Sequence, residues 1–311
     1  MQIIADTLSQ ITVGEPVSIR NLTVFPLLSA ADDIVDYLTL DEALEKRLAC
    51  VTEISKSGSV SELSFVNRGD WSVLLLDGEE LIGAKQNRIL NLTILVPAHR
   101  ELKIPVSCVE QGRWRYRSGV FSSSPRAQSA MARANKVASV TFSLRKSGRP
   151  VSDQSEVWRD IDRLATELKV SSPTNAMSDI YDSYSDDLHE KARAFSAGPG
   201  QVGAVFAING EVIGLDLFDS SSTFGKLLGK LVNSYALQAI ASGLAGVRFE
   251  VHDKTDAQGL LRSLLDADTE AFPSIGEGQN VRIKDDNLAA AALVARDRLV
   301  HLCAFPIKED R

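Results

Sequence analysis

A series of short apolar segments between residues 63 and 109 most limits what this chain can fold into. Turn-forming residues separate these segments, among them Arg68-Gly69-Asp70, Asp77-Gly78 and Pro97. Turn signals about 8–12 residues apart are typical of antiparallel strands, and Asp-Gly is a strong hairpin signal. The sequence therefore predicts a β-rich region with a hairpin at Asp77-Gly78. The predicted strands cover residues 63–67, 72–76, 80–83, 88–96 and 102–109.

Helical spacing appears on both sides of this region. Thr39 and Glu42 form a capping-box pattern that predicts a short helix over 39–49. Pro125 is placed to open a helix running to about Val140, with residues 141–153 as a loop. Apolar residues at helical spacing predict further helices over 154–170, 176–195, 222–242 and 255–266. Strands are predicted over 21–28, 200–218 and 280–305, with a second hairpin turn at Asn209-Gly210, although the Ala-rich run 289–295 also fits a helix.

These elements predict an α+β fold of mostly antiparallel sheets with several packed helices. We expect a β-rich part over 1–117, a basic Ser-rich connector with a short helix over 118–153, and an α+β part over 154–311. The last part is expected to form one unit with the first. Residues 75–83 resemble 207–214, each with a tight turn and a following Gly. This echo indicates either a duplication, giving two similar intertwined lobes, or convergent hairpin chemistry.

Composition narrows the class of protein. The 311 residues are 44% hydrophobic and 24% charged, which is typical of a globular chain. No apolar run approaches the roughly 20 residues that a membrane helix needs. The N-terminus lacks the pattern of a signal peptide, and three scattered cysteines do not make a disulfide framework. We therefore expect a cytoplasmic protein with no membrane partner.

Charge is unevenly distributed. The net charge is −7, yet residues 100–149 hold eleven Lys or Arg and only two acids. Such a block can attract phosphate, a nucleotide or a single nucleic-acid strand, or it can be a solvated basic face. The overall acidity makes nucleic acid the least favoured of these partners.

The first candidate site is the string Gly83-Ala84-Lys85-Gln86-Asn87-Arg88, which lies between two apolar strands. Small residues allow a ligand to approach the backbone closely. Lys85 and Arg88 are candidate anion ligands, and Gln86 and Asn87 offer donors and acceptors for ribose or base. Glu80, just before the string, is a candidate acid, base or ribose ligand. The alternative is an exposed polar loop.

The second candidate site follows the predicted strand 102–109. Alternation places Cys108 and Glu110 on one face, so Glu110 is either at a rim or paired, with Arg113 or Lys85 as partner. Cys108 is a candidate nucleophile if nearby cations stabilise its thiolate, and otherwise a small buried residue. Arg113 and Trp114 are candidates for gripping a phosphate and stacking on a base.

The third candidate group lies in the C-terminal half. Asp216 falls near the position that echoes Lys85, at the end of a predicted strand. His301 sits in an apolar run and is either a satisfied core residue or an acid or base. None of the four histidines belongs to a metal-binding motif, so the sequence indicates no metal site, and it names no cofactor.

Several of these strings resemble one protein family. Gly-Ala-Lys-Gln-Asn-Arg at 83–88, Ile-Pro-Val-Ser-Cys-Val-Glu at 104–110 and Gly-Arg-Trp at 112–114 are its most specific features here. The chain resembles the "ARG and Rhodanese-Phosphatase-superfamily-associated" protein domain family over about 20–306. ARG stands for ADP-ribosylglycohydrolase, so the resemblance implies a link to NAD-derived nucleotides or to biological conflict systems. It supplies no catalytic residue.

The residues and the resemblance lead to one leading hypothesis and two alternatives. In the first, the protein binds, and as an enzyme would process, ADP-ribose or a related nucleotide or phosphate. Lys85, Arg88 and Arg113 would hold phosphate, with Glu80 and Glu110 as acid or base. The alternatives are a non-catalytic module that senses such a ligand or docks a partner enzyme of the ADP-ribosylglycohydrolase or phosphatase type, and a nucleic-acid contact through 100–149.

Overall fold

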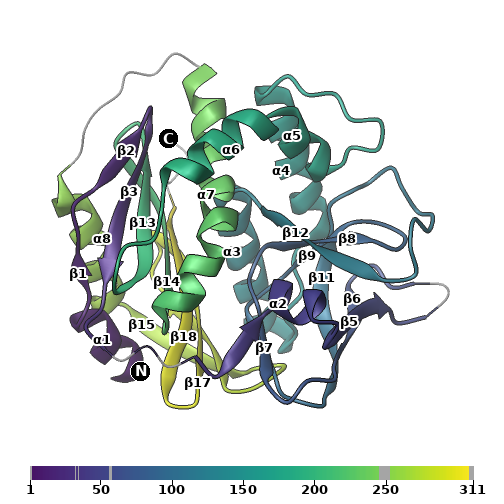
Figure 1. The fold of residues 1–311 in the computed structure, drawn as a ribbon, viewed down its shortest axis with the longest axis horizontal. Helices are drawn as coiled ribbons and strands as arrows, with labels where there is room; N and C mark the ends of the chain where they lie inside the picture. Colours follow the sequence, from purple (N-terminus) through teal and green to yellow (C-terminus); the bar gives the residue numbers. More distant parts are fainter. Residues whose placement is uncertain (1, 32, 34, 56–57, 245–252, 308–311) are drawn as a thin grey trace.

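The computed structural model describes residues 2–31, 33, 35–55, 58–244 and 253–307. Its described part is an α+β fold in which a large antiparallel sheet and a closed six-stranded barrel share a layer of helices (Figure 1). The expectation of an α+β fold with mostly antiparallel sheets is confirmed.

The large sheet joins the two ends of the chain. Its order is β1-β3-β13-β14-β18-β17-β16-β15, and β2 pairs with β3. The pairing of β3 with β13 brings Phe25 opposite Val205, so the first strands lie beside strands some 180 residues later. The strands are β1 (Thr12–Val13), β2 (Val17–Ile19), β3 (Leu22–Leu28), β13 (Gln201–Ile208), β14 (Glu211–Phe218), β15 (Asp268–Pro273), β16 (Gln279–Lys284), β17 (Leu288–Ala295) and β18 (Arg298–Pro306).

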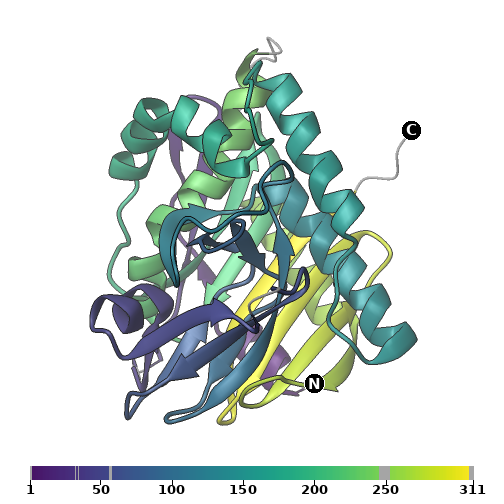
Figure 2. The same ribbon diagram turned by 90° about the vertical axis from the view of Figure 1, so that its right-hand side faces the viewer.

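The barrel is built from the middle of the chain. Its strands close in the order β11-β6-β5-β12-β8-β9, and a small sheet of order β10-β7-β4 lies beside it. In Figure 2 the blue strands of this region lie in front of the yellow strands β17 and β18. The strands are β4 (Tyr37–Thr39), β5 (Ala49–Glu53), β6 (Glu62–Asn67), β7 (Ser72–Leu75), β8 (Glu79–Gly83), β9 (Arg88–Leu90), β10 (Ile94–Val96), β11 (Glu101–Cys108) and β12 (Phe121–Ala127).

Helices cover both faces of the large sheet. Helices α1 and α8 pack on one face, where Val205 and Ala207 of β13 point. Helices α3 and α7 pack on the other face with Ala204 and Phe206, and α7 also contacts β12 of the barrel. The helices are α1 (Gln2–Ser9), α2 (Leu40–Glu45), α3 (Ala130–Ser147), α4 (Gln154–Glu167), α5 (Met177–Ser183), α6 (Ser185–Ala194), α7 (Ser221–Leu244) and α8 (Lys254–Asp266).

Several local predictions are confirmed. Thr39 and Glu42 form both hydrogen bonds of the capping box at α2, although the helix ends at Glu45 because β5 begins at Ala49. Asn209-Gly210 forms the hairpin between β13 and β14, with positive φ at both residues. The run 289–295 is strand β17, so its helical alternative is wrong.

The hairpin expected at Asp77-Gly78 is wrong. The chain does turn there, and Gly78 has a φ of 80°. The flanking strands then separate, because β7 pairs with β4 and β10 while β8 joins the barrel. Gly78 instead donates its N–H to the Leu90 carbonyl. Thus the two echoing segments have different pairings, and the open sheet and the closed barrel are not two similar lobes.

The helix expected to begin at Pro125 is also wrong. Pro125 lies in strand β12, and the helix that follows, α3, begins only at Ala130 and runs to Ser147. Between Ser123 and Ala127 the pairing of β12 with β8 shifts register. A bulge tolerates proline because the residue there needs no ladder N–H. Gly148, with a φ of 67°, ends α3, so residues 141–147 are helical and not part of the loop expected over 141–153.

Candidate functional site

The string 83–88 forms a tight loop between strands β8 and β9 at one end of the barrel. Gly83 has a φ of 136°, and a Cβ there would lie 2.6 Å from Ser118 Oγ and 2.7 Å from the Val120 carbonyl. Only glycine fits this position. Ala84 also has positive φ and donates its N–H to Ser118 Oγ at 2.9 Å. The small pair therefore shapes the loop itself.

Arg113 holds this loop from inside. Its guanidinium donates to the Ala84 carbonyl at 2.8 Å and to Asn87 Oδ1 at 3.1 Å, and forms an ion pair with Glu110 at 2.6 Å. Gln86 donates its side-chain N–H to the Glu110 carbonyl at 2.9 Å. All five of these residues, Ala84, Gln86, Asn87, Glu110 and Arg113, are buried. Gln86, Asn87, Glu110 and Arg113 thus bond to one another rather than face solvent.

The ion pair decides what Glu110 can do chemically. The hydrogen bond and the charge of Arg113 outweigh burial and hold the pKa of Glu110 below its usual range. Arg117 adds a second cation at 3.6 Å. Glu110 is therefore a carboxylate near neutral pH, and it has no proton to donate as a general acid.

Arg88 is fully buried beneath the loop. It donates to Gln86 Oε1 at 3.1 Å and to the Ser59 carbonyl at 3.3 Å, and Glu53 Oε1 lies 3.9 Å away. Burial lowers the pKa of Arg88. The neighbouring Cys108 thiol is buried too, and burial raises its pKa to about 11 despite the charge of Arg88. At neutral pH Cys108 is a thiol, which is a poor nucleophile.

An exposed aromatic surface covers this buried core. Trp114 is 47% exposed and Tyr116 is 51% exposed. Lys85 Nζ lies 5.2 Å from the centre of the Trp114 ring and 5.3 Å from that of Tyr116, within cation–π distance of both. The Arg88 guanidinium lies 5.7 Å from the Trp114 ring. We call Lys85, Trp114, Tyr116 and Arg117 the barrel-end surface.

Glu80 contacts strand β12 rather than this surface. Its carboxylate accepts a hydrogen bond from Ser124 Oγ at 2.9 Å and lies 3.5 Å from Arg126, both on or beside strand β12. Burial raises the pKa of Glu80. Glu80 therefore helps to fix β12 against β8.

Asp216 and His301 come together at a second place, between the large sheet and helix α3. Asp216 accepts two hydrogen bonds from Arg133, at 2.6 and 3.0 Å, and one from Tyr235 at 2.9 Å. His301 Nε2 lies 3.2 Å from Asp216 Oδ1. Arg133 and these hydrogen bonds lower the pKa of Asp216 to about 2 in spite of its complete burial.

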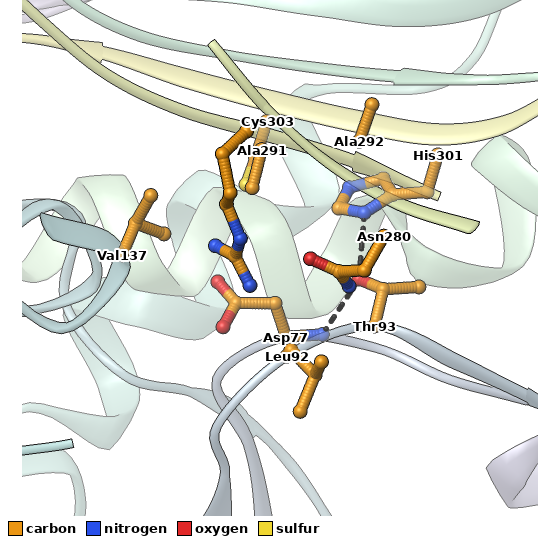
Figure 3. Close-up of a pocket in the computed structure, with 10 residues that line it drawn as sticks. Asp77, Leu92, Thr93, Val137, Asn280, Ala291, Ala292, His301 and Cys303 are labelled. Atoms are coloured by element: carbon orange, nitrogen blue, oxygen red, sulfur yellow. Dashed lines mark hydrogen bonds between the residues drawn. The ribbon is translucent and has the colours of Figure 1, made fainter. Parts of the chain in front are cut away.

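The other side of the imidazole meets a hydroxyl. His301 Nδ1 lies 2.8 Å from Thr93 Oγ1, which also accepts the Asp77 N–H at 3.2 Å (Figure 3). Since an ionised carboxylate only accepts, His301 Nε2 donates to Asp216, and His301 Nδ1 shares the second hydrogen bond with the Thr93 hydroxyl. A hydroxyl, imidazole and carboxylate in this order can activate a nucleophile. The adjacent cavity, however, has room for only about one water molecule.

Sequence reasoning did not single out Tyr116, Thr93, Arg133 or Arg282 as site residues. Tyr116 had a detectable signal, since it alternates with Trp114 in a run that also holds Arg115 and Arg117. Thr93 and Arg282 had none, because each lies within an ordinary strand region. Their significance comes only from what the fold places beside them.

The basic block 100–149 does not form one continuous exposed face. Arg113, Arg133 and Lys136 are buried in ion pairs, and Arg126 and Arg145 pair with acids outside the block. These partners neutralise much of the local charge. Within the described ranges, no group of three or more His, Cys, Asp or Glu could hold a metal ion. No helix in that part is both long and apolar enough to cross a membrane.

The fold and the site define an α+β protein whose barrel ends in an exposed aromatic and cationic surface. The chain belongs to the ARG and Rhodanese-Phosphatase-superfamily-associated protein domain family, whose model matches residues 10–305. The family expected from the strings at 83–88 and 104–114 is thereby confirmed. No curated protein and no solved structure gives a match to the chain.

Proposed function

We propose that the protein binds an ADP-ribose-type or other NAD-derived nucleotide, or a related phosphate ligand, at the barrel-end surface. The observation that carries the proposal is Lys85 held between two half-exposed aromatic rings, Trp114 and Tyr116. Every nucleobase offers a π-face that stacks on such rings, and ammonium and guanidinium groups bind phosphate. The family name, with its reference to ADP-ribosylglycohydrolase, agrees with this ligand class.

The buried residues below the surface have a supporting part in this proposal. Glu110 and Arg113 fix the backbone of 83–87, so Lys85, which is only 8% exposed, is held on a rigid loop beside the two rings. Arg88 adds positive charge under Trp114. Gln86 and Asn87 are engaged within the protein, and we give them a positioning part rather than ligand contacts.

We propose that this surface binds a ligand without catalysing a reaction on it. Glu110 lacks an acidic proton near neutral pH, and Cys108, with a pKa of about 11, lacks a thiolate. A sensor of this kind would leave its ligand intact. ADP-ribose recovered unchanged after incubation with the protein would agree with this, whereas turnover abolished by Glu110→Gln would establish an enzyme.

Calorimetric titration with ADP-ribose, NAD⁺, AMP and ribose 5-phosphate tests the proposal. Loss of a stacking ring costs about 1–3 kcal/mol, so Trp114→Ala should weaken nucleotide binding about 5- to 150-fold. Lys85→Met should weaken all phosphate ligands alike. The matched control is Trp71→Ala, because Trp71 is 50% exposed and lies outside this surface.

Two results would overturn the proposal. In one, the folded wild-type protein binds none of the four ligands. In the other, Trp114→Ala and Trp71→Ala bind them equally well, which would place the ligand elsewhere.

Docking of a partner enzyme is the second candidate function. Val120, 51% exposed, extends the apolar surface of Trp114 and Tyr116 along the same segment. Tyr and Trp are enriched at the centres of protein interfaces. The partner class would be an ADP-ribosylglycohydrolase-type or phosphatase-type enzyme, as the family name indicates. Surface plasmon resonance with such enzymes should show binding that Trp114→Ala weakens and Trp71→Ala does not.

A further inference from the structure

A small cavity lies between the large sheet and the barrel region. None of its lining residues belongs to the barrel-end surface, so it has no part in the proposed function. Strands β16, β17 and β18 supply one wall, and residues 77 and 92–93 supply the opposite wall (Figure 3). Helix α3 contributes Val137. The volume suits about one water molecule or one monatomic ion. The lining residues are Asp77, Leu92, Thr93, Val137, Asn280, Arg282, Ala291, Ala292, His301 and Cys303.

Arg282 is the unusual member of this lining. It is 1% exposed, and its Nε and Nη2 atoms are buried without a hydrogen-bond partner. No carboxylate in the described part of the chain lies within 4 Å of its guanidinium. A buried charge with no counter-charge is strongly unfavourable, and native proteins pair such groups. Arg282 therefore points to a missing negative partner.

The acids nearby are already paired with other cations. Asp216 holds Arg133, and Asp77 holds Lys136 at 2.6 Å and Arg133 at 3.4 Å. Asp77 acts on Arg282 only from beyond ion-pair distance. Three cations, Arg133, Lys136 and Arg282, thus face two carboxylates, Asp77 and Asp216. The cluster is left with an excess positive charge beside Arg282.

Burial disfavours the protonated form of Arg282, but the guanidinium stays charged at neutral pH. The pKa of Arg282 is lowered to about 10, which leaves the guanidinium protonated at neutral pH. Burial also lowers the pKa of Lys136, while Asp77 opposes that shift. The buried Asn280 Oδ1 has no partner in the structure, and rotation of its amide would turn N–H donors toward the cavity instead.

We propose that this cavity is a binding site for one compact monovalent inorganic anion of halide size, held by Arg282 and Asn280. Leu92, Val137, Ala291 and Ala292 form the apolar part of its lining, and Asp77, Thr93, His301 and Cys303 complete it. A dry apolar wall cannot replace a hydration shell, so the site should favour weakly hydrated chloride and bromide over fluoride.

Thermal unfolding in different sodium salts at constant ionic strength tests this site. Gluconate, which is too large for the cavity, serves as the reference anion. Chloride and bromide should give a saturable rise in Tm of about 2–4 °C over gluconate. Arg282→Met should abolish that rise. Arg262→Met, which removes an exposed arginine from α8, is the control and should retain it.

Bromide-soaked crystals of the wild-type protein give a readout that needs no variant. We expect an anomalous peak beside the Arg282 guanidinium, reduced by Asn280→Leu, which also serves if Arg282→Met does not fold. Equal Tm values in all salts, or no anomalous peak at the cavity, would overturn the proposal and leave a water molecule there. Neither result bears on nucleotide binding at the barrel-end surface.

Discussion

At the scale of single residues, each candidate's chemistry depends on its nearest partner in space. Cys108 and Glu110 lie two positions apart on β11 and just beyond it, yet burial raises the pKa of one and Arg113 lowers that of the other. Trp114, only one residue after Arg113, is half exposed while Arg113 is buried. Residue type alone indicates candidates, and the environment decides which of them can act.

The buried ion pair between Asp216 and Arg133 predicts a large effect of mutation. Asp216→Asn would leave the Arg133 guanidinium buried without its carboxylate, at a cost of about 3–5 kcal/mol in unfolding free energy. Denaturant titration measures this loss. As a control, Asp187→Asn breaks the exposed pair with Arg20 and should cost less than about 1 kcal/mol. Equal losses would contradict our assignment of Asp216.

The same carboxylate predicts a pH dependence of stability. The pKa of Asp216 is about 2 in the folded protein, against an ordinary value of 3.8. Its stabilisation is therefore fully present above about pH 4 and is lost as the pH falls through 2. The shift corresponds to about 2 kcal/mol of unfolding free energy. Acid titration followed by circular dichroism should show this loss in the wild type and not in Asp216→Asn.

At the scale of elements, turn chemistry is local but strand pairing is not. Asp77-Gly78 and Asn209-Gly210 both reverse the chain, and only the second joins paired strands. Pro125 meets the requirements for a helix start as well as those of a strand bulge. Pairing with β8 selects the strand over the helix, because β12 pairs with β8 and the register of that pairing shifts around Pro125.

Alanine substitution at Gly83 and at a control glycine should change the free energy of unfolding in opposite directions. Gly83→Ala forces a Cβ against Ser118 and the Val120 carbonyl at positive φ, and should destabilise the protein by about 1–3 kcal/mol. Gly229→Ala in α7 meets open space and should stabilise it by about 0.5–1 kcal/mol. Thermal or denaturant unfolding measures both. A neutral Gly83→Ala would contradict the tight loop described here.

At the scale of the whole molecule, buried polar contacts tie the barrel region to the large sheet and its helices. Lys230 of α7 pairs with Glu79 of β8 at 2.5 Å, and Tyr37 of β4 donates to Asp219 after β14 at 2.5 Å. His301 of β18 meets Thr93 beside β10. Each contact couples residues far apart in sequence, so neither part keeps its buried polar groups satisfied alone.

This coupling predicts one cooperative unfolding transition. Tryptophan fluorescence reports on Trp71 and Trp114 near the barrel and on Trp158 in α4, while far-ultraviolet circular dichroism reports on the helices and sheets. The two curves should coincide in a denaturant titration. Hydrogen exchange in β11 and β17 should likewise reach the same maximal protection. Two separate transitions would show instead that the barrel and the sheet are independent units.

The sequence by itself determined much of the secondary structure and the place of the main candidate site. Apolar periodicity, capping residues and turn residues act over a few positions, which is why α2, α4 and the hairpin at Asn209-Gly210 were predicted. The family also follows from short strings, since 83–88 and 104–114 are specific. These strings do fold into one place, at the end of the barrel.

Only the tertiary structure decided which strands pair and which site residues face solvent. Pairing of β3 with β13 depends on contacts across most of the chain, and no local pattern encodes them. Burial of Gln86, Asn87 and Arg113 depends on hydrogen bonds that close only when the barrel does. The charge of Arg282 is unpaired because the carboxylates near β16 already pair with other cations, Asp216 with Arg133 and Asp77 with Lys136. Local propensity is short in range, whereas burial and charge are properties of the whole packed chain.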